Sequence, residues 1–160
     1  MQHADAVLRH ARGVATGRDA LAAGDPGRLD EAAETLCKAD ELLKGDAGVR
    51  ALVGNRDLAS GISGLVAESL PMVLTIESTL ESRDDAALIE SSAAALARVK
   101  DALWALENDR LRTAREVEVL AGLQSPPEAV VGYLAIQQAL SAIDRMEVRG
   151  RDSAGIGVVV

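Results

Sequence analysis

Apolar side chains recur every three to four residues along most of this chain, and that spacing predicts α-helices. We expect a first helix over residues 4–23 and a second over residues 29–44, separated by a Gly-Asp-Pro-Gly breaker. A short helix is expected over residues 49–53. Residues 57–82 are also helical in spacing, although glycines weaken this helix and Pro71 is expected to kink or restart it.

The strongest periodicity covers residues 85–123, where apolar positions form a heptad-like seam. This seam consists of Ile89, Leu96, Val99, Leu103, Leu106, Val117 and Leu120. Arg110 and Thr113 interrupt it, while Trp104 and Leu111 flank it and widen the face that we expect to be buried. The pattern predicts a long helix or a helical hairpin that packs against a partner helix.

A domain border is expected at a Ser-Pro-Pro-Glu segment. Ser125 is placed to cap a helix, Pro126 suits its first position, and Glu128 completes a capping box. We therefore divide the chain into a helical module, residues 1–124, and the start of a different domain, residues 125–160. The fold class is expected to be mostly α, with a bundle of about four to six helices before a final helix and strand.

Composition narrows the kinds of partner. The chain has 160 residues, of which 48% are hydrophobic, with no Phe, one Trp and one Tyr, so Ala, Leu, Val and Ile must build the core. The net charge of −8 argues against nucleic acid and against an anionic membrane surface as partners. Glu68 and Pro71 interrupt the longest apolar region, so we expect no transmembrane helix.

The candidate reactive groups favour structural roles. A single cysteine, Cys37, excludes an intramolecular disulfide framework and fits a cytoplasmic location. It has acidic neighbours and lies beside an apolar stripe, so we expect a buried thiol and no nucleophile. His3 and His10 lack a third ligand in register, and we predict neither a metal nor another cofactor. The Gly-Ile-Ser-Gly of residues 61–64 is expected to provide small residues at a helix–helix contact.

Residues 147–155 carry the one specific motif, reading Glu-Val-Arg-Gly-Arg-Asp-Ser-Ala-Gly. This segment resembles the glutaminase domain of glutamine–fructose-6-phosphate aminotransferases, whose pattern is Leu-Glu-Tyr-Arg-Gly-Tyr-Asp-Ser-Ala-Gly. The resemblance covers about residues 126–160, including the preceding helix and the apolar residues that follow. The matching residues are Glu147, Arg149, Gly150, Asp152, Ser153, Ala154 and Gly155. Val148 and Arg151 depart from it, since the family has tyrosines there.

The resemblance implies a fold and a site. These domains are class II glutamine amidotransferases of the N-terminal-nucleophile hydrolase fold, so residues 125–160 would supply a helix and a strand of an incomplete α+β sandwich. In the family the arginine of this turn lies near the nucleophile, so Arg149 would help to shape the glutamine site. The other residues that the resemblance assigns to shaping this site are Gly150, Asp152, Ser153 and Gly155.

The resemblance also shows what these residues lack. The family's nucleophile is an N-terminal cysteine, whereas Gln2 and His3 follow Met1 here, and its glutamine-binding arginine and oxyanion-hole Asn-Gly are missing. We therefore expect a fragment, inactive alone and with no catalytic residue of its own, of an enzyme making glucosamine 6-phosphate and glutamate. Its substrates would be glutamine and fructose 6-phosphate. The alternative is a non-catalytic helical interaction or dimerisation module, forming a homo-oligomer through the seam described above.

Overall fold

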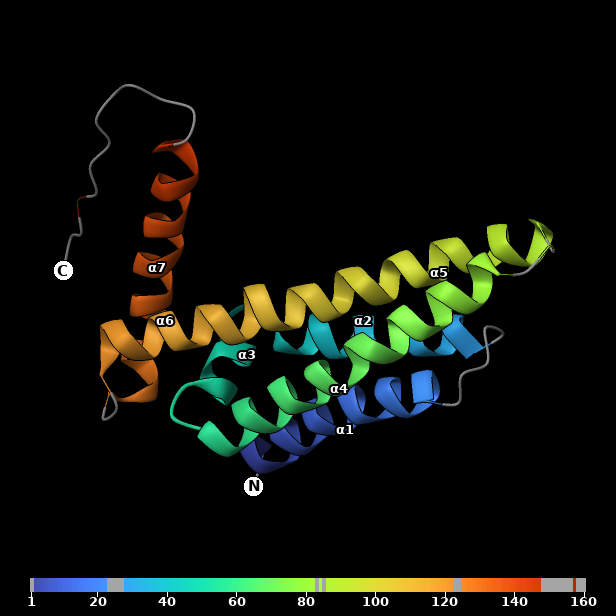
Figure 1. Cartoon of the computed structure of the whole chain (residues 1–160). Helices are drawn as coiled ribbons and strands as arrows, with labels where there is room; N and C mark the ends of the chain where they lie inside the picture. The colour runs from blue at the N-terminus through green and yellow to red at the C-terminus, as the bar shows by residue number, and fades with distance from the viewer. Residues whose placement is uncertain are drawn as a thin grey trace.

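The computed structural model describes residues 2–22, 28–82, 84, 86–122, 125–147 and 157. These residues are almost entirely helical and form a bundle, which confirms the mostly-α prediction (Figure 1). None of them lies in a strand. The strand expected near residues 154–160 falls outside the described residues, apart from Gly157.

Four helices form the elongated body of the molecule (Figure 1). They are α1 (Gln2–Ala22), α2 (Leu29–Leu43), α4 (Arg56–Glu81) and α5 (Ala86–Ala105). The helix α1 packs on α2 and α4, and α2 packs on α5, so apolar stripes meet along the body. Fully buried members of this core include Leu36, Leu43, Ile62, Val99 and Leu103.

The short helix α3 (Gly45–Leu52) connects α2 to α4 and begins earlier than the spacing predicts. Its early start places Gly48 in a buried position directly over the carbonyl oxygen of Leu43. Asn55 then caps α4, because its Oδ1 accepts a hydrogen bond from the Leu58 amide at 3.2 Å. The corner between α2 and α4 is therefore closely packed.

The helix α4 runs through Pro71 as one element, so the chain does not restart there. Apolar side chains on both sides of the proline are buried in the same core, and this packing offsets the local cost of the missing amide hydrogen. Among the described residues, α4 is also long and apolar enough to cross a membrane by length and composition alone. One such helix is weak evidence for a membrane.

Residues 86–121 form one continuous helical rod, so the prediction of a long helix is confirmed and the hairpin is wrong. The rod consists of α5, a π-helical turn η2 (Leu106–Leu111) and α6 (Arg112–Ala121). The wider turn adds one residue to the inward spacing, so Leu106 and Leu111 are both fully buried although they are five apart. Beyond the turn the buried positions continue through Ala114 and Val117, whereas Leu120 is exposed. Trp104, which precedes the turn, is also exposed.

The central part of the predicted seam is already covered within the chain. Leu96, Val99, Leu103 and Leu106 are buried in the core that α5 and η2 share with α2 and α4. A second copy could therefore reach these side chains only if the bundle opened. Any surface for self-association must lie elsewhere on the folded molecule.

Candidate functional site

The helix α7 (Pro127–Glu147) stands across the end of the body and leads away from it (Figure 1). It starts close to the predicted border, with Pro127 rather than Pro126 as its first residue. Ser125 is not its cap, because the Ser125 hydroxyl donates to the Ala121 carbonyl at the end of α6. This bond ties the connection to α6 and fixes where α7 begins.

The first half of α7 is held by a small apolar cluster. Val130 and Leu134 of α7 are buried against Val49 of α3 and Val117 of α6. The packing brings α3, α6 and the start of α7 together, and α3 thereby connects α7 to the main body. The second half of α7 is less covered, since Leu140 remains 43% exposed.

The buried side chain of Gln137 adds a polar contact between α7 and α6. Gln137 of α7 is only 5% exposed, and its Nε2 donates to Glu116 Oε2 at 2.6 Å and to Ser141 Oγ at 2.8 Å. The other carboxylate oxygen of Glu116 accepts from Arg112 Nε at 2.7 Å. Both oxygens of Glu116 are therefore bonded, one within α6 and one across to α7, and the ionised form is favoured.

The hydrogen bond from Arg112 is the main reason that the pKa of the Glu116 carboxyl lies below its ordinary value. Burial acts in the opposite direction, and the bond from Gln137 adds to the lowering. A folded-state pKa below the unfolded value, about 4.3, means that this carboxylate stabilises the fold above that pH. The stabilisation is lost as the pH falls through the lowered value.

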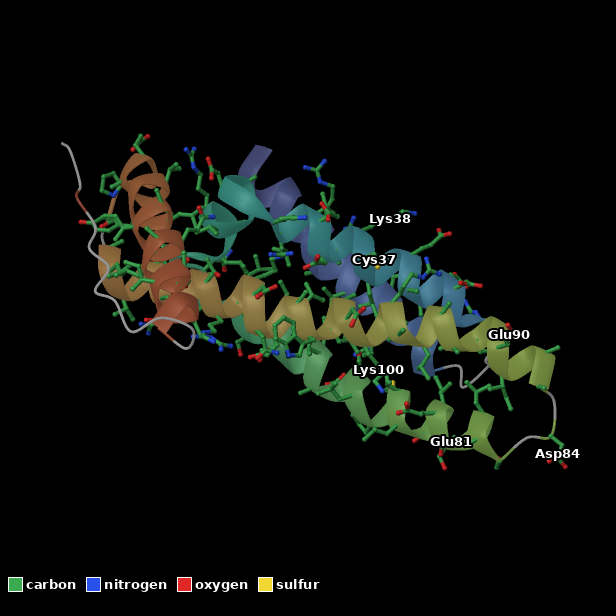
Figure 2. All side chains as sticks on the ribbon, turned by 90° about the horizontal axis from the view of Figure 1, so that it is seen from above. Cys37, Lys38, Glu81, Asp84, Glu90 and Lys100 are labelled. Atoms are coloured by element: carbon green, nitrogen blue, oxygen red, sulfur yellow. The ribbon has the colours of Figure 1, made fainter. Side chains whose placement is uncertain are left out.

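We expect the second half of α7 to loosen in acid before the body unfolds, because protonation of Glu116 weakens the bond that it accepts from Gln137, whereas the apolar cluster still holds the first half. The fluorescence of Trp104, which lines the hollow beside α7, should change below about pH 4, ahead of the helical signal in circular dichroism. The Glu116→Gln variant should flatten this early step and loosen α7 at neutral pH. The control Glu90→Gln changes an exposed glutamate of α5 (Figure 2). An unchanged acid profile in Glu116→Gln would contradict the assignment.

Two adjoining hollows, of about 360 and 310 Å³, lie between α6 and α7. Both are lined by Glu116, Gln137, Ser141 and Asp144. Exposed apolar side chains border them: Trp104, Val119, Leu120 and Leu140. We call this region the α6/α7 groove. Charges of both signs lie inside the apolar rim, since Arg112 and Arg115 line the hollows beside Glu116 and Asp144. An apolar rim around mixed polar groups suits the surface of another protein domain.

Nothing in the groove forms a catalytic set. Glu116 is committed to two hydrogen bonds, and across the described residues no three His, Cys, Asp or Glu side chains are grouped to hold a metal ion. Cys37 is only partly buried, packed against the core on α2 (Figure 2). Ser63 lies within α4 and donates its hydroxyl to Glu107 Oε2 at 3.0 Å, so it has a structural partner.

The residues that the family resemblance assigns to the glutamine site lie outside the described residues. They are Arg149, Gly150, Asp152, Ser153 and Gly155. The structure therefore brings none of them into a described site. The groove itself was missed by the sequence analysis. A signal for it exists, since Gln137 occupies an inward position in the apolar pattern of α7.

No protein-family model, curated protein or solved structure matches this chain.

Proposed function

We propose that residues 125–160 open a glutaminase domain of the class II amidotransferase type, and that residues 1–124 form a helical module attached to it. The observation that carries the proposal is the family motif of residues 147–155, which directly follows the helix α7 along the chain. The described part of α7 reaches Glu147, the first residue that matches this motif. In the family the motif also follows a helix, and it forms an Arg-Gly turn that leads into an apolar strand.

The α6/α7 groove supports this arrangement. The half of α7 that approaches the motif is the half that the helical module leaves uncovered, with Leu140 and Asp144 on the groove wall. A domain continuing from residue 147 would begin at the edge of this groove and could cover its apolar rim. The module would then be a rigid base for the glutaminase domain.

In this proposal the present residues shape the glutamine site without performing the chemistry. The family's cysteine thiolate attacks the side-chain amide of glutamine, ammonia leaves, and water releases glutamate. The ammonia then serves a sugar-phosphate partner domain that forms glucosamine 6-phosphate. Arg149 would favour the end of α7 through the helix dipole and hold its guanidinium near the reacting thiol. Both substrates are soluble metabolites, and we place the activity in the cytoplasm.

The complete reading frame that encodes residues 1–160 tests the proposal. We expect a Met-Cys-Gly-Ile-like start upstream, and an arginine, an Asn-Gly pair and a sugar-isomerase domain downstream. The encoded protein should release glutamate from glutamine and form glucosamine 6-phosphate with fructose 6-phosphate. A frame without these features, or a protein that leaves glutamine intact, would contradict it.

A variant of that protein tests the site. Arg149→Ala should lower kcat/KM for glutamine about tenfold, the usual effect of losing one charge-assisted hydrogen bond. Arg98→Ala is the matched control, because Arg98 makes an exposed ion pair with Asp30 on the bundle. Equal activity in the two variants would remove Arg149 from the site.

A second candidate is a module for self-association, and the exposed face of α4 favours it. Leu70 and Leu74 project from that face with 50% and 63% of their surface exposed. This role is compatible with the first, because the helical module and the glutaminase domain would use different surfaces.

A further inference from the structure

The outer face of α4 carries a second row of helical positions, all of them exposed among the residues that the structure describes. Its exposed positions alternate in steps of four and three, the spacing of a helix that packs along a partner helix. We call these positions the outer seam: Ser60, Gly64, Ala67, Pro71, Leu74, Ser78 and Glu81. Figure 1 shows α4 along the outside of the body, and Figure 2 shows Glu81 projecting from its end. Only 28% of the most apolar window of α4 is buried.

The chemistry of the outer seam suits close approach by a helix. Between Ser60 and Ser78 the positions of the outer seam carry no charge. Apart from the adjoining backbone of α4, no atom of the described residues lies within 4 Å of where a side chain on Gly64 would begin. Sequence reasoning assigned the glycines of residues 61–64 to a helix contact, yet within the monomer Gly61 and Gly64 face open space. The contact that they would serve is therefore not inside one copy.

The arrangement of large and small residues along the outer seam fits a second copy of the same helix in the antiparallel direction. Reversing the seam about Ser69 places Leu74 opposite Gly64, Pro71 opposite Ala67, and Ser78 opposite Ser60. A two-fold axis at that point therefore sets each projecting side chain over a small one, as an isologous contact requires. The same reversal places Glu81 of the second copy level with Asp57 and next to Arg56, whose side chain is 77% exposed and lies 3.9 Å from Glu118 of its own copy.

We propose that this chain forms a homodimer in which two α4 helices pack antiparallel through the outer seam. The net charge of −8 repels other copies over most of the surface, so a contact must use an uncharged face, and this seam supplies one. A parallel pair would instead stack Leu74 on Leu74 and leave a gap at Gly64. This homodimer rests on the second candidate function, self-association, and does not require the glutaminase domain.

Sedimentation of the full chain is the first test. We expect reversible dimers with half-association between about 1 and 100 μM, as for a modest interface. Ala67→Glu adds a charge at the centre of the contact and should weaken association about 100-fold. Ala94→Glu makes the same change at an exposed position of α5 and should leave association unchanged. A monomer throughout this range, or equal effects of both variants, would overturn the proposal.

Gly64→Ala is expected to change the stability of the monomer and the strength of dimerisation in opposite directions. Removing a helical glycine in open space should raise the melting temperature of the monomer by about 2 °C. The added methyl group fills the hollow opposite Leu74, so association should weaken at least about tenfold. A more stable monomer with undiminished dimerisation would show that another surface is used.

Cross-linking tests the orientation. In a Cys37→Ser background, chains with Ser60→Cys and chains with Ser78→Cys should form mixed disulfide dimers when combined. Residue 60 cross-linked to residue 60 would indicate a parallel pair and overturn the antiparallel arrangement. Neutral phosphatidylcholine vesicles provide a further arm, since partition of the wild-type chain into them in place of dimerisation would show that lipid covers the face.

Discussion

Gly48→Ala is expected to destabilise the folded chain by about 3 kcal/mol, at the upper end for overpacking by a single methyl group. A methyl carbon at this position would lie 1.8 Å from the carbonyl oxygen of Leu43 and 2.1 Å from its carbonyl carbon. These are backbone atoms at the corner between α2 and α3, and they cannot turn aside as the tip of a side chain can. Urea unfolding followed by circular dichroism measures the loss.

Gly61→Ala is the matched control for this change. Gly61 is also helical, but beyond the adjoining backbone of α4 no described atom lies within 4 Å of where its side chain would begin. The same substitution should therefore stabilise α4 by about 0.5–1 kcal/mol through helix propensity. The two variants shift stability in opposite directions if the close approach at Gly48 is real, and shifts of one sign would contradict it.

The substitution at Gly48 should also loosen the docking of α7 beside the α6/α7 groove. Gly48 precedes Val49, which packs against Val130 and Leu134 of α7. Moving α3 to relieve the contact would displace this small cluster, so α7 should dock less firmly in Gly48→Ala than in Gly61→Ala. Trp104 fluorescence reports that difference in the folded state, because Trp104 lines the hollow beside α7.

The bundle could be predicted from the sequence because its apolar stripes are regular. The second helix is the clearest case, since Leu29, Leu36 and Leu43 recur every seven residues and all three are buried. Pro71 was harder, because the residue itself favours a break and only the core on both sides of it keeps α4 continuous. Proline by itself disfavours a continuous helix, but the apolar side chains buried on both sides of Pro71 outweigh that preference.

The π-helical turn shows why the seam was only partly predicted. Steps of three and four leave Arg110 and Thr113 as interruptions between Leu106 and Val117. The structure instead takes one step of five, from Leu106 to Leu111, which moves the inward face by one residue. Leu111 thereby becomes fully buried, and Trp104 remains on the surface, 60% exposed. A fixed helical period cannot anticipate an extra residue in one turn.

The candidate site was predictable only in part, for a related reason. The motif at residues 147–155 is contiguous and can be recognised along the chain. The α6/α7 groove joins residues far apart in sequence, such as Glu116 and Gln137, through the angle between two helices. That angle depends on α3 and on the Ser125 bond to Ala121, neither of which helical periodicity specifies.

The buried ion pair of the π-helical turn provides the second large effect. Arg110 Nε donates to Asp40 Oδ1 at 2.8 Å, and Arg110 Nη2 donates to Asp40 Oδ2 at 3.1 Å. The two side chains are 18% and 15% exposed, so this two-pronged pair is largely removed from water. It joins η2 to α2 at the point where the helical register changes.

Asp40→Ala should cost about 2–3 kcal/mol, somewhat less than the loss expected for a fully buried pair, because water still reaches Arg110. Asp30→Ala is the matched control. Asp30 is also on α2 and pairs with an arginine of the same rod, Arg98, but the pair is exposed and should contribute at most about 1 kcal/mol. Similar losses in the two variants, measured by urea unfolding, would contradict a buried role for Asp40.

The double variant Asp40→Leu with Arg110→Met shows whether the ion pair mainly stabilises the fold or mainly fixes the register of the π-helical turn. Replacing both charges by apolar groups leaves no unpaired ion, so stability should return to within about 1 kcal/mol of the original chain. If the pair also fixes the π-helical turn, the double variant should relax toward regular α-helix there, changing amide exchange from Leu106 to Leu111. The buried pair would then act mainly to hold the rod in the register that directs Leu111 inward and leaves Trp104 at the α6/α7 groove.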